Sequence, residues 1–265
     1  MSSAALNYVT YLKLEPILNA QSPQSKGAEG FEHDEMLFII IHQVYELWFK
    51  QLLHEVDYLQ ERLHDNDTSR SLHTLRRILT ILKTVVGQID VLETMTPLEF
   101  NSFRSYLDTA SGFQSVQFRE LEFTLGYKRQ SILLHFPEGL FGRQRLEERY
   151  QQRTLWDAFL YYLTLNGYDV PPEQLKRDVT QPITPSRRIQ EILIDIYRHN
   201  PVISRICERL IDLDEGIQEW RYRHVKMVER TIGAKMGTGG SSGVKYLRST
   251  LKPLYPDLWA IRSEL

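Results

Sequence analysis

Two long segments of the chain repeat large or apolar residues in alternating steps of four and three, which limits the fold more than any other feature. Such spacing places all members on one face of an α-helix, which can then pack along its length against other helices. The first segment carries Phe38, His42, Tyr45, Phe49, Leu52, Val56, Leu59 and Leu63. The second carries Ile206, Leu210, Leu213, Ile217, Trp220, His224, Met227 and Thr231. The pattern predicts two long core helices, each with one histidine in its buried seam.

Capping residues mark the ends of these helices. Asn200 and Pro201 suit the N-cap and first turn of the second helix, and Gly233 suits its end. That helix would hold about 30 residues and span roughly 45 Å. Asp34 is the expected cap of the first helix. Residues 36–41 are apolar all round, which predicts that the start of the first helix is buried on every side.

The remaining pattern is also helical. Thr96 is an expected N-cap with a capping-box glutamate, and the short helix after it carries Phe100, Phe103 and Arg104. The segment 111–115 should interrupt the helical pattern, which resumes in a further helix that ends at Leu125. Other helices are expected at about 69–93, 153–166 and 185–199, and the charged stretch 126–152 should be irregular. No alternating strand of useful length occurs, so the expected class is all-α, a bundle-like arrangement of long core helices.

Composition sets the broad class of protein. The chain has 265 residues, 42% of them hydrophobic, which suits a single domain over 1–265. A net charge of −2 gives no basic field for nucleic acid. Cys207 is the one cysteine, so an internal disulfide is impossible and a reducing cytoplasm fits. The N-terminus does not resemble a signal peptide, and no apolar run approaches the ~20 residues of a membrane span. We expect a cytoplasmic protein without nucleic-acid or membrane partners.

Each buried histidine has two interpretations. It can be a packed, hydrogen-bonded core residue, or it can be a metal ligand. Basic residues surround His224 and can either pair with the carboxylates of a bound cofactor such as haem or form a solvated helix face. These residues are Arg221, Arg223, Lys226, Arg230 and Lys235.

Two further features point to the binding of an anion. The segment 237–243 contains four glycines and three hydroxyl residues, including Thr238, which suits close backbone approach to a carboxylate or a flexible linker. Arg104 is a charge among Phe100, Phe103 and Leu107, so it is either a surface ion pair or a partner for a substrate carboxylate.

Several metal chemistries do not fit the sequence. A di-iron bundle needs two inward Glu-x-x-His motifs, and Glu61–His64 is a lone match at a helix end. With a single cysteine, iron–sulfur clusters, structural zinc and c-type haem attachment are excluded. A single axial histidine remains, with the second buried histidine on the other side of a slot. Such an iron would keep one position free for O₂.

Six motifs occur in an order that matches a known family. They are FIIIHQVYELW (38–48), LETMTP (92–97), FRSYL (103–107), SGFQS (111–115), WRYRH (220–224) and GTGGSSG (237–243). Together they resemble the tryptophan 2,3-dioxygenase family. The resemblance runs from about Tyr8 to Leu254 and is weakest between 127 and 190, which is expected to be a variable helical insertion.

The resemblance implies an enzyme with one haem b per subunit that opens the indole ring of L-tryptophan with O₂ to give N-formyl-L-kynurenine. It makes His224 the axial iron ligand, with Ser111, Gly112 and Trp220 as further cofactor contacts. His42 becomes the distal catalytic histidine beside the indole N–H, and Arg104 and Thr238 hold the carboxylate. The other implied substrate contacts are Phe38, Ile39, Ile40, Ile41 and Phe100. Position 100 is Phe where many bacterial members carry Tyr, from which we expect tuning rather than loss of activity.

The family is homotetrameric, so the resemblance also implies a shared active site. Tyr8, Tyr11 and Leu12, within the N-terminal segment 1–31, would reach the pocket of a neighbouring subunit. Three alternatives remain open: a haem enzyme that acts on another aromatic amino acid, a haem-based sensor, and a helical scaffold with two core histidines.

Overall fold

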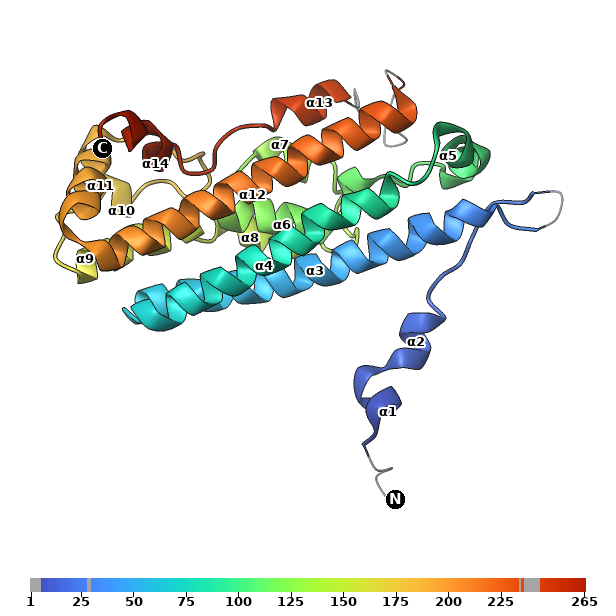
Figure 1. Ribbon diagram of the computed structural model, residues 1–265, viewed down its shortest axis with the longest axis horizontal. Coiled ribbons are helices and arrows are strands. Elements are labelled where there is room, and N and C mark those ends of the chain that lie inside the picture. The colour runs from blue at the N-terminus through green and yellow to red at the C-terminus, as the bar shows by residue number, and fades with distance from the viewer. Residues whose placement is uncertain (1–5, 28–29, 234, 236–243) are drawn as a thin grey trace.

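Three long helices form the centre of the molecule. The computed structural model describes residues 6–27, 30–233, 235 and 244–265, with the backbone alone at 245. The long helices are α3 (His33–His64), α4 (Thr68–Leu92) and α12 (Pro201–Ile232), and α4 packs against both others. Figure 1 shows all three running side by side. They contribute most of the large hydrophobic core, so the prediction of long core helices is confirmed.

Close contact between α4 and α12 depends on a small residue. Gly216 lies in α12, and a Cβ atom added there would stand 2.6 Å from Leu82 Cδ2 on α4. A methyl group at that distance overlaps its neighbour, so glycine lets the two helix backbones approach.

Most predicted helix boundaries are confirmed. The Asn200 side chain accepts a hydrogen bond from Ile203 N at 3.1 Å, and Gly233 ends α12 with a φ of 60°. Thr96 forms a capping box with Glu99 at the start of α5 (Pro97–Arg104). Further confirmed helices are α6 (Val116–Leu125), α9 (Leu155–Leu165) and α11 (Arg187–His199).

The predicted cap of the first helix is wrong. Glu32 is the N-cap of α3 without a side-chain hydrogen bond, and Asp34 lies in the first turn. Glu35 accepts hydrogen bonds from the backbone N–H groups of Gln24 at 2.7 Å and Ser25 at 2.9 Å. Because these bonds hold the preceding chain against the first turn, the helix begins without the predicted cap.

The prediction that residues 36–41 are buried on every side is also wrong for the single chain. Met36 is 41% exposed and Ile40 is 42% exposed, whereas Ile41 is buried. The neighbouring elements cover one side of this turn only. The short helices α1 (Tyr8–Leu12) and α2 (Leu14–Leu18) contain no buried residue and extend away from the bundle (Figure 1). Both apolar surfaces are thus open to a partner.

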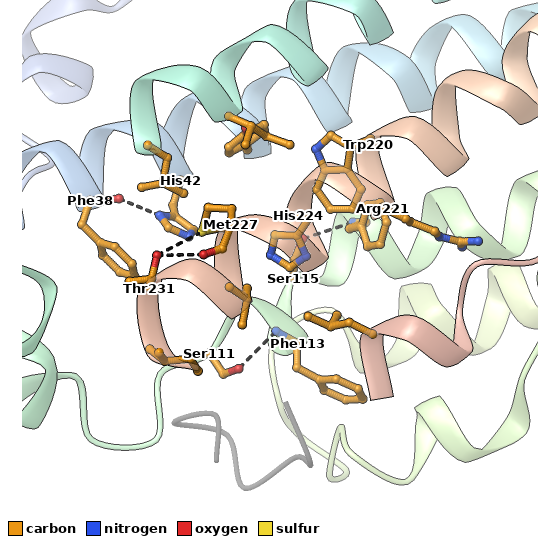
Figure 2. Close-up of a pocket in the computed structure, with 18 of the residues that line it drawn as sticks. Phe38, His42, Ser111, Phe113, Ser115, Trp220, Arg221, His224, Met227 and Thr231 are labelled. Carbon is orange, nitrogen blue, oxygen red and sulfur yellow. Dashed lines mark hydrogen bonds between the residues drawn. The ribbon is translucent and has the colours of Figure 1, made fainter. Parts of the chain in front are cut away.

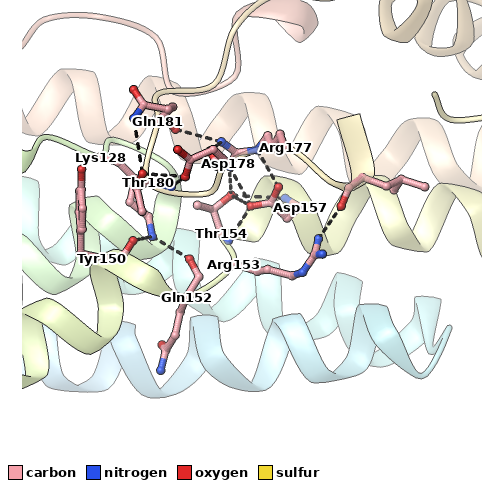
Figure 3. A network of polar contacts seen from close by, with 11 residues as sticks. Lys128, Tyr150, Gln152, Arg153, Thr154, Asp157, Arg177, Asp178, Thr180 and Gln181 are labelled. Carbon is pink, nitrogen blue, oxygen red and sulfur yellow. Dashed lines mark hydrogen bonds and ion pairs between the residues drawn. The ribbon is translucent and has the colours of Figure 1, made fainter. Parts of the chain in front are cut away.

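The stretch 126–152 is more ordered than predicted. It contains α7 (Gln130–Leu133) and α8 (Arg143–Gln151). The sequence pattern hid α8 because only Leu146 and Tyr150 of its residues are buried. The Lys128 ammonium group caps the C-terminal end of α8, where helix carbonyls concentrate negative charge. It donates hydrogen bonds of 2.7 Å to the carbonyls of Arg149, Tyr150 and Gln152 (Figure 3).

A second polar contact fixes the link after α9. Arg177 donates two hydrogen bonds to the buried Asp157 carboxylate, at 2.7 and 2.8 Å. Asp157 also caps α9 by accepting from Thr154 (Figure 3). The short helix α10 (Pro172–Leu175) lies in this link.

The described residues contain helices and no strand, so the all-α class is confirmed. A smaller core of seven buried residues joins α6, α7 and α8. The chain ends in α13 (Val244–Ser249), α14 (Pro256–Ala260) and a 3-10 turn. Within the described ranges, no helix combines the length and apolar character that a membrane span requires.

Candidate functional site

A cavity of about 250 Å³ lies between the long helices, α5, α6 and α13. It contains both seam histidines. In Figure 2, His42 and Phe38 extend from α3, and His224 and Trp220 extend from α12. Ser111 and Phe113 belong to the segment between α5 and α6. The sequence-predicted residues that line it are Phe38, His42, Phe100, Arg104, Ser111, Gly112, Trp220 and His224.

His224 is held by an aromatic neighbour. Its ring stacks on Trp220 with 5.2 Å between centroids and 7° between planes. Trp220 itself packs against Phe118 at 4.6 Å and Phe49 at 6.0 Å. Burial, followed by the nearby charges of His42 and Arg119, lowers the pKa of His224 to about 4. The ring is therefore neutral at pH 7 and has a nitrogen lone pair for a metal.

His42 has a fixed tautomer when it is neutral. Its Nδ1 lies 2.7 Å from the carbonyl oxygen of Phe38, which can only accept a hydrogen bond. Nδ1 therefore carries the proton, and Nε2 carries the lone pair. Burial lowers the pKa of His42, and this outweighs the opposing effects of that hydrogen bond and of Glu46. Near neutral pH the ring thus offers an acceptor.

Aromatic side chains cover His42 on one side. The Phe38 ring lies 4.2 Å from the His42 ring and 5.8 Å from Phe100, centroid to centroid. Arg104 lies at the end of α5, one turn after Phe100, and lines the same cavity. This wall therefore combines apolar rings with one guanidinium group.

A buried ion cluster borders the cavity on α6 and α12. Glu122 pairs with Arg119 at 2.7 Å, with Arg221 at 2.8 Å and with Arg129 at 3.0 Å. Burial alone would raise the pKa of Glu122, but the three guanidinium groups outweigh it and lower the pKa to about 2. Three positive charges against one negative charge leave an excess of two positive charges beside the cavity.

The sequence pattern did not reveal this cluster. Local spacing gives no contact between position 122 and position 221, which lie on different helices. One signal was present: residues 118–123 read FRELEF, and charges inside an apolar helical run indicate buried ion pairs when the helix is covered.

The basic residues around His224 divide into two groups. Arg221 is buried and belongs to the ion cluster. Arg223, Lys226 and Arg230 pair with acidic residues of the protein, namely Asp90, Glu93 and Glu229. Lys235 is exposed. These ion pairs favour the solvated-face interpretation for Arg223, Lys226 and Arg230, whereas Arg221 lines the cavity.

Several predicted substrate contacts lie outside the cavity of the single chain. Ile39, Ile40 and Ile41 do not line it: at about 100° per residue, Ile40 lies on the face opposite Phe38 and His42, and Ile39 and Ile41 lie to either side of them. Tyr8, Tyr11 and Leu12 lie on the N-terminal arm, where Tyr8 is 74% exposed. Thr238 and the rest of 237–243 lie outside the described residues.

Comparison with known proteins decides the family. The model of a family described as tryptophan 2,3-dioxygenase matches residues 1–136 and 185–265. The chain belongs to the tryptophan 2,3-dioxygenase family. The tryptophan 2,3-dioxygenase of Herpetosiphon aurantiacus is 65% identical over 99% of this chain and 100% of its own length. Those of Anaeromyxobacter sp. strain K and Arthrobacter sp. strain FB24 are 54% and 40% identical, over 99% of this chain and 97% and 93% of their lengths.

The family match and the cavity coincide. All residues that line the cavity fall within the two ranges matched by the tryptophan 2,3-dioxygenase model. Residues 137–184, which include α8, α9 and α10, fall between those ranges and within the predicted insertion 127–190.

Proposed function

We propose that this chain is a tryptophan 2,3-dioxygenase that inserts both atoms of O₂ across the C2–C3 bond of the L-tryptophan indole, giving N-formyl-L-kynurenine. This reaction is the first step of tryptophan degradation by the kynurenine pathway. One observation carries the proposal: in a member of this family, the partly buried and neutral rings of His224 and His42 line one cavity.

The residues around the cavity fit one haem b per subunit. His224 has an available lone pair at neutral pH, and it lines the cavity. The excess of two positive charges in the Glu122 cluster matches the two carboxylates of haem b. Ser111, Gly112 and Trp220 would contribute further contacts. When bound, haem supplies the activation of O₂ that amino-acid side chains cannot provide.

The protein orients the substrate. Phe38 and Phe100, which pack on each other, offer apolar faces to the indole ring. His42 Nε2 accepts a hydrogen bond from the indole N–H, because Nδ1 is occupied by the Phe38 carbonyl. Arg104 pairs with the amino-acid carboxylate, and Thr238 is proposed to share that contact. Fixing the indole at both ends presents one ring edge to the oxidant.

His42→Leu tests the indole contact. We expect kcat/KM for L-tryptophan to fall about fivefold, because one neutral hydrogen bond is lost. The analogue 1-methyl-L-tryptophan has no indole N–H, so its kcat/KM should not fall. Steady-state kinetics with both substrates gives the ratio of wild-type to variant kcat/KM for each of them. An equal loss for both substrates would show that His42 acts through packing alone.

The remaining proposals concern the assembly. A homotetramer is supported by the exposed arm that carries Tyr8, Tyr11 and Leu12 and by the exposed Met36 and Ile40. In such an assembly the arm would complete a neighbour's pocket.

Cytoplasmic localisation is supported by the single buried thiol of Cys207. We further propose one haem domain over 1–265 in which 127–190 is a variable insertion, consistent with the gap in the family match.

A product assay tests the proposed function. The purified protein is reconstituted with haem, reduced with ascorbate and supplied with L-tryptophan in air. We expect a Soret band and the formation of N-formyl-L-kynurenine. Absence of the Soret band would refute the haem proposal. A Soret band without product would favour a sensor or a haem enzyme with another substrate.

A further inference from the structure

We infer that Glu122 is a positioning residue for this reaction: it orients three arginines, two of which fix α13 as one wall of the cavity. Its activity readout rests on the proposed function, whereas its structural readout does not. Glu122 is buried on α6 and has no predicted contact with substrate.

Glu122 uses both carboxylate oxygens. Its Oε2 accepts from Arg119 Nη1 at 2.7 Å and from Arg129 Nη2 at 3.0 Å. Its Oε1 accepts from Arg221 Nη2 at 2.8 Å. The three arginines come from α6, from the segment after α6 and from α12. Glu122 is therefore the common acceptor of three separate parts of the chain.

Two of these arginines also donate hydrogen bonds to α13 or to the residue that follows it. Arg221 Nη1 donates to the carbonyl of Thr250 at 2.8 Å. Arg129 Nη1 donates to the Tyr246 hydroxyl at 2.8 Å. Both Tyr246 and Thr250 line the cavity. Glu122 is thus connected to Tyr246 through the guanidinium group of Arg129, and to Thr250 through that of Arg221.

The negative charge of Glu122 holds the guanidinium groups of these arginines close to one another. Three guanidinium groups that share one small buried volume repel one another, and the repulsion is strong because little water screens it. Arg129 and Arg221 also both stack on Tyr127, at 4.4 and 4.7 Å from its ring centroid. Without the carboxylate, we expect these two cations to separate and release Tyr246 and Thr250.

Glu120 provides a matched control on the same helix. It is equally buried, but it pairs with Arg145 at 2.8 Å and Arg149 at 3.8 Å on α8, outside the cavity lining. Glu120→Gln removes the same charge from the same helix. It should therefore report the general cost of losing a buried carboxylate on α6.

The test compares Glu122→Gln with Glu120→Gln in the holoenzyme. Backbone hydrogen exchange over 244–250 should become about tenfold faster in Glu122→Gln and stay unchanged in Glu120→Gln. KM for L-tryptophan should rise about tenfold while kcat changes less than about threefold, because ligand enclosure weakens and the groups at the indole remain. Glu122→Asp, which keeps the charge, should recover part of the KM.

Tyr246→Phe covers the case in which Glu122→Gln does not fold. It removes only the hydroxyl that accepts from Arg129, and exchange over 244–250 should again increase. Unchanged exchange in the folded variants, or equal increases in Glu120→Gln, would overturn the inference. If wild-type protein forms no N-formyl-L-kynurenine, the function proposal fails while the exchange comparison still decides the role of Glu122.

Discussion

Replacing His224 with alanine is expected to abolish both haem retention and turnover. The ring is neutral, lines the cavity and stacks on Trp220, so its lone pair is fixed in direction. Alanine removes the only proposed axial ligand. Absorbance at the Soret band after haem reconstitution and gel filtration measures occupancy, and product formation measures turnover.

His64→Ala is the matched control for this experiment. His64 lies at the other end of α3, where it packs on Tyr161 at 4.7 Å and lines no part of the cavity. This variant should retain haem and activity. Added imidazole fits the space left in His224→Ala and should restore part of the Soret band. Full haem retention in His224→Ala would show that another residue is the ligand.

The second large effect is expected at Arg104. Arg104→Ala should raise KM for L-tryptophan roughly 10- to 100-fold with little change in kcat, because a hydrogen bond to a charged group contributes about 1.5–3 kcal/mol. The apolar faces of Phe38 and Phe100 remain to bind the indole. Steady-state kinetics over a wide range of tryptophan concentration separates KM from kcat.

Two controls isolate the carboxylate contact. Arg104→Lys keeps the positive charge but loses the two-pronged geometry, so its KM should lie between those of the wild type and Arg104→Ala. Tryptophanamide lacks the carboxylate, and its KM should be similar in all three proteins. A tryptophan KM that does not change in Arg104→Ala would refute the proposed clamp.

The sequence predicted the core of this site because its determinants are local and periodic. The four–three spacing placed His42 on α3 and His224 on α12, and both residues line the cavity. The capping box at Thr96 placed Phe100 and Arg104 on one short helix, and that helix also faces the cavity. In each case a pattern within a single helix fixed the direction of a side chain.

The sequence did not predict features that depend on contacts between distant segments. Glu122 meets Arg221 across two helices, and Glu35 fixes the residues before α3. The highly charged α8 is fixed from outside by Lys128. Ile39, Ile40 and Ile41 were assigned to the substrate by resemblance, and none of them lines the cavity of the single chain.

Oxygen labelling tests the proposed reaction most directly. The reconstituted, reduced protein is supplied with L-tryptophan under ¹⁸O₂, and the product is analysed by mass spectrometry before its carbonyl oxygens exchange with water. We expect N-formyl-L-kynurenine that carries two ¹⁸O atoms from one O₂ molecule. A product with a single labelled oxygen, such as a hydroxylated indole, or the recovery of unchanged tryptophan would contradict dioxygenation at this site.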